Sequence, residues 1–349
     1  MEKLRVAVIG AGMAGARCAR QLADSGCAVM LFDKSRGAGG RLATRRRPAP
    51  DGAGTWRLDH GAAGILAGDD DFADQLRDWT GAGLLASWNP RVVQVASDGR
   101  HLKADGSDRG CLGQSADRVG PASVGLPGMS APVRALVGDL PLKAGCRIER
   151  IWRGPDDSWW LATGAGADFG PFDAVVLALV PPQAAALLPA GYCDLRLRLQ
   201  AIPVAPRWTV LHFGGQARGP LEDVDALRFD SGPIELAIRN DRRPGRQDSP
   251  GWVLHARVDW SARHVHRPPG WVSAALGAAF RRVGGPAPAL SQAHRWLYAH
   301  PQPQPGAGYL LRDGLGLCGD WLAGGQVEGA WRSGGLLAKA LLHEGEVVQ

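Results

Sequence analysis

The chain is short of lysine, lacks any long apolar run and has no paired cysteines, and each shortage excludes a class of protein. No stretch of about eighteen uncharged apolar residues occurs, so the sequence predicts no transmembrane helix. The first strand begins at once, which leaves no room for a secretory leader. Six cysteines stand without C-x-x-C spacing, which predicts reduced thiols rather than disulfides: Cys18, Cys27, Cys111, Cys146, Cys193 and Cys318. We therefore expect a cytoplasmic protein that does not associate with a membrane.

Motifs of hydrolases and metalloenzymes are also missing. There is no H-E-x-x-H, no nucleophile elbow and no persuasive Ser-His-Asp pattern, which argues against hydrolysis. His264 and His266 lie two residues apart and form either part of a metal site or a solvated basic edge. Because no third ligand is in view, the sequence predicts no metal.

The charge balance argues against a nucleic-acid partner. The net charge of +6 comes from a basic set that is rich in arginine and holds only five lysines. The excess is dispersed, and no RNP, zinc-finger or recognition-helix pattern accompanies it. It fits a small anionic substrate such as a dinucleotide better. Thirteen tryptophans dominate the bulky residues, and we expect most of them to pack in cores or between domains.

A glycine-rich turn follows directly after an apolar strand at residues 6–9. Gly10, Gly12 and Gly15 form G-x-G-x-x-G, and Asp33 closes the next strand. In such a turn the first glycine permits the bend, the second lets the backbone approach a pyrophosphate, and the third brings the helix close to the sheet. Met13 and Ala14 open that helix. The pattern predicts binding of a cofactor that contains ADP.

A second glycine-rich stretch, residues 34–45, indicates which cofactor. It contains Lys34, Arg36, Gly40 and Arg41. A dehydrogenase that uses NAD has no evident need for such a loop. FAD lying extended through a domain would have its pyrophosphate wrapped from both sides, with forked hydrogen bonds from Arg41. We therefore favour FAD over NAD. The run Arg45–Arg47 either extends this site or forms only a solvated basic face.

The C-terminal part of the chain contains a second pattern that is expected of the same cofactor site. Residues 315–320 form a short apolar strand that ends in Gly319 and Asp320, and a helix opens near Gln326 and Val327. Asp320 is suited to accept hydrogen bonds from ribityl or ribose hydroxyls. The positive end of the helix is suited to stabilise negative charge on the N1–C2=O edge of a reduced flavin. Cys318 is either a covalent attachment point for the flavin or, as we favour, a packed thiol.

The chain is long enough for two domains, and the split should be discontinuous in sequence. We predict an α/β fold: a Rossmann-like FAD-binding domain from residues 1–70, 128–182 and 301–349, with Ile148 near the adenine. A discontinuous α+β substrate domain, residues 71–127 and 183–300, should be built on an antiparallel sheet. Strands at 208–213, 234–239 and 252–259 alternate in polarity, and a helix is expected over 271–283.

Short sequence motifs along nearly the whole chain resemble those of the renalase-like branch of the FAD-dependent amine oxidase superfamily. They are residues 10–15, 33–46, 59–62, 128–130, 173–179, 293–299 and 319–334. The resemblance implies that Asp59, His60 and Gly61 also contact FAD. It further implies oxidation of misreduced 1,2- and 1,6-dihydro isomers of NAD(P)H, with hydride transfer to flavin N5. Oxygen would accept the electrons as hydrogen peroxide.

One segment departs from that family. After Asp-His-Gly-Ala the family continues with Gln, an aromatic pair and Thr, whereas this chain has Ala63-Gly64-Ile65-Leu66. Small and aliphatic groups there would enlarge and dry the substrate pocket. Either another aromatic residue fills the space, or the substrate differs.

The expected chemistry needs no general base, because a dihydropyridine donates hydride as it becomes aromatic. We predict His60 near the flavin edge, with Trp296, Arg295 and His212 around the substrate ring or its phosphates. Each of the last three also has a plain structural alternative: a core tryptophan, an arginine in an inter-domain ion pair, and a histidine satisfied within a strand.

Two other functions remain open. One is oxidation of an amine or another reduced heterocycle, although the few lysines supply poorly the lysine-bound water that amine oxidases use. The other is a regulatory protein that binds flavin or NAD without turnover, if the segment at residues 63–66 closes the pocket.

Overall fold

The computed structural model describes residues 3–49, 52, 54–96, 101–102, 122–215 and 219–347; Cys111 lies outside these ranges. The chain forms two compact units. Unit 1 comprises Met1–Gly40, Pro132–Val204 and Pro301–Gln349, and unit 2 comprises Arg41–Ala131 and Ala205–His300. Compared with the predicted domains, residues 41–70 and 128–131 fall in unit 2 and residues 183–204 in unit 1. The junctions at 204/205 and 300/301 lie inside two long strands, where sequence carries no linker signal.

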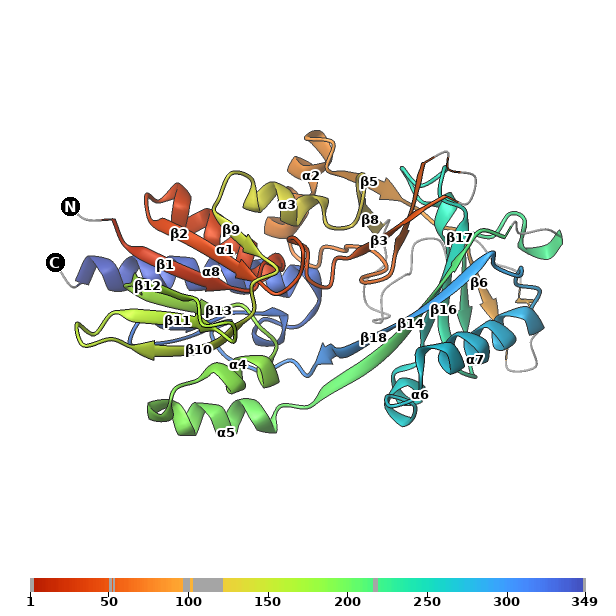
Figure 1. Ribbon diagram of the computed structural model, residues 1–349. Helices are drawn as coiled ribbons and strands as arrows, with labels where there is room; N and C mark the ends of the chain where they lie inside the picture. The colour runs from red at the N-terminus through yellow and green to blue at the C-terminus, as the bar shows by residue number, and fades with distance from the viewer. Residues whose placement is uncertain are drawn as a thin grey trace. The chain divides into compact units, whose positions relative to one another are not determined.

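Unit 1 is built on a parallel sheet whose strands are short apolar runs. The order is β19 (Leu310–Arg312), β20 (Leu315–Leu317), β13 (Ala174–Leu177), β1 (Arg5–Ile9), β2 (Ala28–Asp33) and β9 (Leu142–Ala144). Only β19 is antiparallel to its neighbour. Val6, Ala7 and Val8 are fully buried, as expected for a strand covered on both faces. The sheet thus combines strands from both ends of the chain, and Figure 1 shows the red N-terminal strands beside the blue C-terminal helix.

Two layers cover this sheet. On one face lie α1 (Met13–Asp24) and α8 (Gln326–Val347). The two helices are so close at Gly334 that a Cβ there would stand 2.2 Å from the oxygen of Ala14. The other face packs against a three-stranded meander and two short helices in one apolar core. These elements are β10 (Ile148–Arg153), β11 (Trp159–Thr163), β12 (Asp168–Phe172), α4 (Pro181–Leu187) and α5 (Cys193–Ala201).

Unit 2 contains a seven-stranded sheet. Its order is β18 (Leu290–Pro301), β14 (Val204–Phe213), β17 (Gly251–Ala256), β16 (Ile234–Arg239), β15 (Ala226–Phe229), β6 (Val92–Val95) and β7 (His101–Leu102). Pairs β14–β17, β17–β16, β16–β15 and β6–β7 are antiparallel, and β15–β6 is parallel. The prediction of an α/β fold with a Rossmann-like sheet and a second, antiparallel sheet is confirmed.

One face of the sheet of unit 2 is covered by α6 (Val258–Arg263) and α7 (Pro269–Arg282). Trp208, Val210, Leu254, Leu276 and Phe280 form part of their common core. Because side chains alternate along a strand, the neighbouring residues of β14 and β17 point to the other face. There Leu211, Phe213 and Val253 meet Leu58. This alternation decides below which predicted site residues can meet.

The rest of unit 2 contains two antiparallel strand pairs, a helix and connections. The pairs are β3 (Thr44–Pro48) with β4 (Thr55–Asp59) and β5 (Leu85–Trp88) with β8 (Ala122–Gly125). Helix α2 (Asp70–Gly81) starts where Asp69 accepts a hydrogen bond from the nitrogen of Phe72 at 2.8 Å. Helix α3 (Ala131–Val137) crosses the junction between the units.

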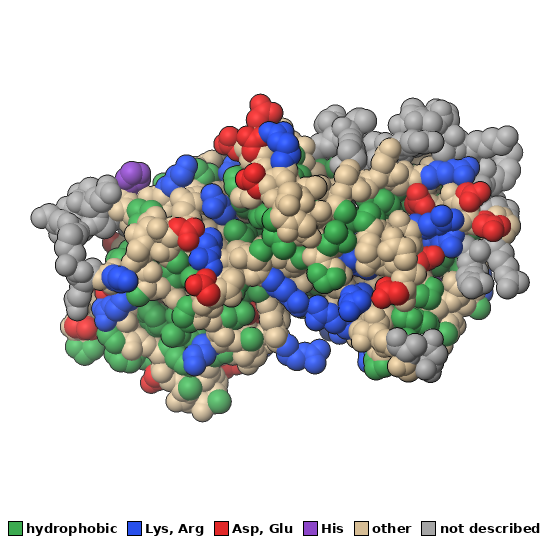
Figure 2. All heavy atoms as spheres, turned by 90° about the horizontal axis from the view of Figure 1, so that it is seen from above, with side chains coloured by type: hydrophobic (Ala, Val, Ile, Leu, Met, Phe, Trp, Pro, Cys, Tyr) green, Lys and Arg blue, Asp and Glu red, His purple; other side chains and the backbone are tan. Residues whose placement is uncertain are grey.

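On the face shown in Figure 2, hydrophobic, basic and acidic side chains all reach the surface. None of the helices searched within the described residues has the length and apolar character to cross a membrane. Within the same residues, no group of three or more His, Cys, Asp or Glu side chains is placed to hold a metal ion.

Candidate functional site

The glycine turn of unit 1 is tied to the end of the second strand. The nitrogen of Gly10 donates to the oxygen of Phe32 at 2.8 Å, and the nitrogen of Ala11 donates to Asp33 Oδ2 at 2.8 Å. Asp33 Oδ1 accepts from the nitrogen of Ser35 at 2.7 Å. Each carboxylate oxygen thus binds one backbone donor and keeps further acceptor capacity. Asp33 fixes the turn at the carboxyl edge of the sheet, next to the β1–β13 switch in strand order where ligands of such sheets bind.

The three glycines of the fingerprint have different reasons to be glycine. Gly10 has φ +107°, and a Cβ on it would stand 2.4 Å from the oxygen of Ala178. A Cβ on Gly15 would stand 1.9 Å from the oxygen of Gly10. The protein itself therefore requires both. A Cβ on Gly12 would meet nothing nearer than the Cα of Gly40 at 3.8 Å, an ordinary contact. The space beside Gly12 is open, so packing within the protein does not require a glycine at this position.

The second glycine-rich loop lies against the first. The nitrogen of Gly39 donates to the oxygen of Ala11 at 2.9 Å. Gly40, with φ +56°, comes so close that a Cβ on it would be 3.0 Å from the Cα of Gly12. Lys34 and Arg36 are exposed on the same loop. Two turns rich in backbone N–H groups, with cationic side chains beside them, therefore meet at one edge of unit 1.

The segment after β9 joins this edge. The nitrogen of Cys146 donates to the oxygen of Asp33 at 2.9 Å, and that of Gly145 to the oxygen of Ser35 at 2.7 Å. Ile148, predicted beside an adenine, follows directly and is 6% exposed within the apolar core of unit 1. Its side chain is thus mostly occupied by core packing.

The C-terminal half of the predicted site is locally well braced. The nitrogen of Gly319 donates to Ser333 Oγ at 2.9 Å, and that hydroxyl donates to the oxygen of Gly308 at 2.6 Å. Asp320 is 6% exposed, while Gln326, at the start of the 22-residue helix α8, is exposed with φ +61°. Cys318 is fully buried, and the neighbouring Cys18 together with burial raises its pKa well above the usual value. This supports the interpretation of Cys318 as a packed thiol rather than an attachment point for the flavin.

In unit 2, Asp59 lies at the centre of a buried ionic cluster. Its Oδ2 is 2.9 Å from Arg246 Nη2 and 3.6 Å from Arg243 Nε, and its Oδ1 accepts from Thr44 Oγ1 at 2.5 Å. Asp59, Arg243 and Arg246 are each 0% exposed. Two cations thus share one carboxylate, and burial lowers the pKa of Arg243 to about 10. Asp59 was predicted to contact the cofactor, but its carboxylate forms its ion pairs and a hydrogen bond within unit 2.

The next residue, His60, belongs to a cluster of rings. The centroids of His60 and Trp296 are 5.2 Å apart with the planes tilted by 30°, and Trp296 Nε1 donates to the oxygen of His60 at 2.9 Å. His294 stands edge-on to both rings, at 4.9 Å and 4.4 Å. Arg45 Nη2 lies 3.3 Å from His294 Nδ1. We call His60, His294, Trp296 and Arg45 the ring cluster.

The histidines of the ring cluster are neutral at ordinary pH. Burial, followed by smaller effects of the neighbouring His294 and Arg45, lowers the pKa of His60 to about 3. Burial, then Arg45, lowers the pKa of His294 to about 4. Among the described residues, His60 Nδ1 is buried without a hydrogen-bond partner. The cluster therefore offers neutral imidazoles beside a guanidinium.

These low pKa values predict a loss of stability in acid. The pKa values of His60 (about 3) and of His212, His294 and His300 (each about 4) lie below 6.5 in the folded protein. Between pH 6.5 and 4 the unfolded chain binds protons that the folded chain does not. The free energy of unfolding should therefore decrease as the pH is lowered, by at most about 1.4 kcal/mol per pH unit for each histidine. Urea unfolding from pH 7.5 to 4.5 measures the slope. His60→Gln should make it shallower; identical slopes in both proteins would contradict the assignment.

Two of the four predicted catalytic residues do not join the ring cluster. His212 is 2% exposed, and its ring lies 6.0 Å from that of Phe280 of α7. Arg295 places its guanidinium 5.8 Å from the ring centroid of Trp208 and donates to the oxygen of Val265 at 2.8 Å. Both therefore occupy the α7 face of the sheet, whereas His60 and Trp296 lie across from it. The four residues cannot surround one ring together.

The remaining predicted residues of unit 2 have structural partners. Arg41 Nη1 donates to the oxygen of Ala299 at 3.0 Å. A Cβ on Gly61 would stand 1.9 Å from the oxygen of Arg41, so Gly61 is needed for the close pairing of these segments. Arg45 turns towards His294, while Arg46 and Arg47 are exposed, as a solvated basic face would be.

Sequence reasoning did not single out His294, His300, Arg243 or Arg246, and it left Arg45 open between the FAD site and a solvated basic face. For His294 and His300 a signal was present, because they alternate with Trp296 along a strand and so share its face. For the two buried arginines no local pattern existed.

Comparisons with known proteins agree with this fold. Residues 8–79 match the family model of the NAD(P)-binding Rossmann-like domain. Cyclohexylamine oxidase from Brevibacterium oxydans IH-35A is 14% identical with TM-score 0.73, covering 99% of this chain and 100% of that one. Putrescine oxidase bound to putrescine is 12% identical with TM-score 0.72, covering 98% and 100%. A protein of Exiguobacterium sp. 255-15 described as a protoporphyrinogen oxidase has TM-score 0.74 at 13% identity, covering 99% and 100%. The chain therefore has the fold of these oxidases.

Proposed function

We propose that the chain is an FAD-dependent oxidoreductase of the renalase-like branch, acting on 1,2- and 1,6-dihydro isomers of NAD(P)H. Support for a dinucleotide cofactor comes from the turn at residues 10–15. The open side of Gly12, which the fold does not need, suits the close approach of a pyrophosphate. Backbone donors, Lys34 and Arg36 stand beside it.

FAD is favoured over NAD by the second loop and by the fold. The loop ending at Gly40 lies against the fingerprint turn, which suits a pyrophosphate held from two sides. Gly12, Asp33, Gly40, Asp320 and the start of α8 would hold the cofactor. When bound, FAD would supply two-electron redox chemistry, taking a hydride equivalent from the substrate and passing electrons to oxygen.

The ring cluster is the observation that carries the substrate assignment. Trp296 and His60 have flat, mostly apolar rings, and their contact and the hydrogen bond from Trp296 to the backbone oxygen of His60 hold them in place. The cluster offers no carboxylate: its charged member is Arg45, and its histidines are neutral. A protonated amine would find no counter-charge among these four side chains, whereas a neutral dihydropyridine needs none. Such a ring needs orientation and exclusion of water, not a general base.

The first alternative is oxidation of an amine, as the printed names of cyclohexylamine oxidase and putrescine oxidase suggest. The aliphatic segment at residues 63–66 also favours a substrate unlike that of the renalase-like branch. The lack of a carboxylate among the four members of the ring cluster speaks against a cationic substrate.

Anaerobic mixing of the purified flavoprotein with candidate reductants decides between these functions. The 1,2- and 1,6-dihydro isomers of NAD(P) should bleach the flavin absorbance rapidly, while ordinary NAD(P)H, putrescine and cyclohexylamine should not. Trp296→Phe keeps an aromatic ring but removes the donor to His60, and should slow bleaching. Bleaching by an amine alone would replace the proposal with the alternative. Failure of every reductant, dithionite excepted, would favour a regulatory flavoprotein.

A further inference from the structure

A basic hollow opens at the free edge of the sheet of unit 2. It has a volume of about 400 Å³ and lies where β18 passes the connection between α6 and α7. The residues that line it include Trp208, His266, Arg267, Ala293, His294 and Arg295. Because Ala293, His294 and Arg295 are consecutive in a strand, their side chains alternate between its two sides. The hollow therefore follows the edge of β18 rather than one face of the sheet.

Two guanidiniums in this hollow are held in place without a counter-charge. Arg295 donates to the oxygen of Val265 at 2.8 Å and lies 5.8 Å from the ring centroid of Trp208. Arg267 lies 5.1 Å from the ring centroid of Trp271. Within the part of the chain that the structure describes, neither forms an ion pair, and no Asp or Glu lines the hollow. The hollow is thus electropositive and preorganised.

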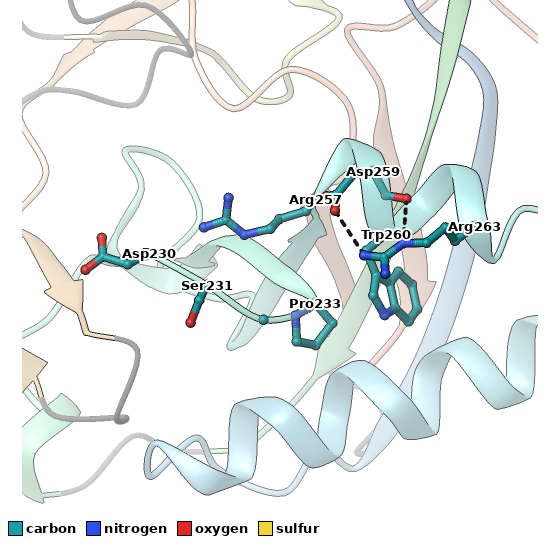
Figure 3. Close-up of a pocket in the computed structure, with 8 residues that line it drawn as sticks. Asp230, Ser231, Pro233, Arg257, Asp259, Trp260 and Arg263 are labelled. Atoms are coloured by element: carbon teal, nitrogen blue, oxygen red, sulfur yellow. Dashed lines mark hydrogen bonds and ion pairs between the residues drawn. The ribbon is translucent and has the colours of Figure 1, made fainter.

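A second hollow of the same unit shows the contrast. It has a volume of about 490 Å³ and lies at the turn between β15 and β16, beside α6 (Figure 3). There Arg263 Nη2 is 3.0 Å from Asp259 Oδ2, Arg257 donates to the oxygen of Phe229, and Asp230 accepts from Gln94. Two arginines and two aspartates line this hollow, so it has no excess of positive charge that would call for an anionic ligand.

We infer that the hollow at β18 binds the phosphate groups of the substrate; this rests on the proposed dinucleotide substrate. Guanidiniums stacked on indole rings present their N–H forks to a phosphate with little loss of side-chain freedom. His294 joins the two regions, because it both lines the hollow and touches the rings of His60 and Trp296. A ring on the ring cluster would thus have its phosphates at the edge of β18, next to Arg295 and Arg267.

The test compares a substrate that carries phosphate groups with one that has none. Anaerobic flavin reduction is followed with a 1,6-dihydro isomer of NADH and with the matching dihydronicotinamide riboside, which has no phosphate. In the Arg267→Gln, Arg295→Gln double variant, half-saturation with the dinucleotide should rise about tenfold or more, with the limiting rate little changed. Half-saturation with the riboside should not change.

Arg150→Gln is the matched control, since this arginine also lies over an indole, that of Trp152 at 4.5 Å, but belongs to unit 1. It should behave as wild type with both substrates. Equal losses for both substrates in the double variant, or no loss for either, would overturn the assignment of the hollow.

Direct binding separates this inference from the proposed function. Inorganic pyrophosphate, titrated by calorimetry into the protein with FAD bound, should bind wild type and lose about tenfold in affinity in the double variant. Competition with the dinucleotide but not with the riboside would assign the site to the phosphates of the substrate. Binding of pyrophosphate without competition would mean a site for free phosphate and would overturn the inference. If neither substrate reduces the flavin, the proposed function fails and the calorimetric result alone decides whether the hollow binds phosphate.

Discussion

Replacing Gly12 with alanine should leave the fold intact and prevent the protein from retaining FAD. The added Cβ would have its nearest protein atom at 3.8 Å, so the protein has room for it. It would occupy the space that backbone N–H groups leave for a pyrophosphate. We expect FAD affinity to fall about a hundredfold, or ~2.7 kcal/mol, while the unfolding free energy of the apoprotein changes little.

Gly15→Ala is the control that separates ligand from fold. Its Cβ would stand 1.9 Å from the oxygen of Gly10 and 2.9 Å from the Cβ of Ala178, so helix α1 would have to move off the sheet. The apoprotein should lose about 3 kcal/mol of stability, in the range of overpacked cores. Urea unfolding of the apoproteins and fluorescence titration with FAD measure both quantities. If Gly12→Ala retained FAD as wild type does, the dinucleotide site would be elsewhere.

Asp59→Asn should be among the most destabilising conservative substitutions in unit 2. It leaves Arg243 and Arg246, both 0% exposed, without any negative charge. Breaking a buried ion pair by removing one partner costs about 3–5 kcal/mol, because the desolvated charge that remains is uncompensated. The free energy of unfolding, from urea titration followed by tryptophan fluorescence, should fall by that amount.

A matched control and a second substitution test the cause. Asp259→Asn breaks a pair with Arg263 of 3.0 Å, but both side chains are about two-thirds exposed, so the loss should stay below about 1 kcal/mol. Adding Arg243→Met to Asp59→Asn removes one of the two orphaned cations and should restore part of the stability. Equal losses for Asp59→Asn and Asp259→Asn would show that the buried cluster contributes no more than a surface pair.

Local sequence was sufficient where function depends on backbone shape. The turn at residues 10–15, the acidic end of β2 and the apolar strands of both units follow from glycine placement and from period-two or continuous apolar patterns. These features are set by neighbours within about thirty residues, so the chain carries their full signal. The split into a parallel and an antiparallel sheet was predictable for the same reason.

Tertiary structure decided which side chains meet. Arg243 and Arg246 contact Asp59 although more than 180 positions separate them in the chain, and more than 230 positions separate His294 from His60. Such pairs depend on strand order and register, which local patterns do not encode. His212 and Arg295 have residue types suited to contact a substrate ring, yet strand alternation turns both away from the ring cluster, to the face covered by α7. By itself the sequence determined that a dinucleotide turn exists and where it lies; only the packing of distant strands decided which rings and charges stand together, because side-chain direction and long-range pairing arise when the sheet forms.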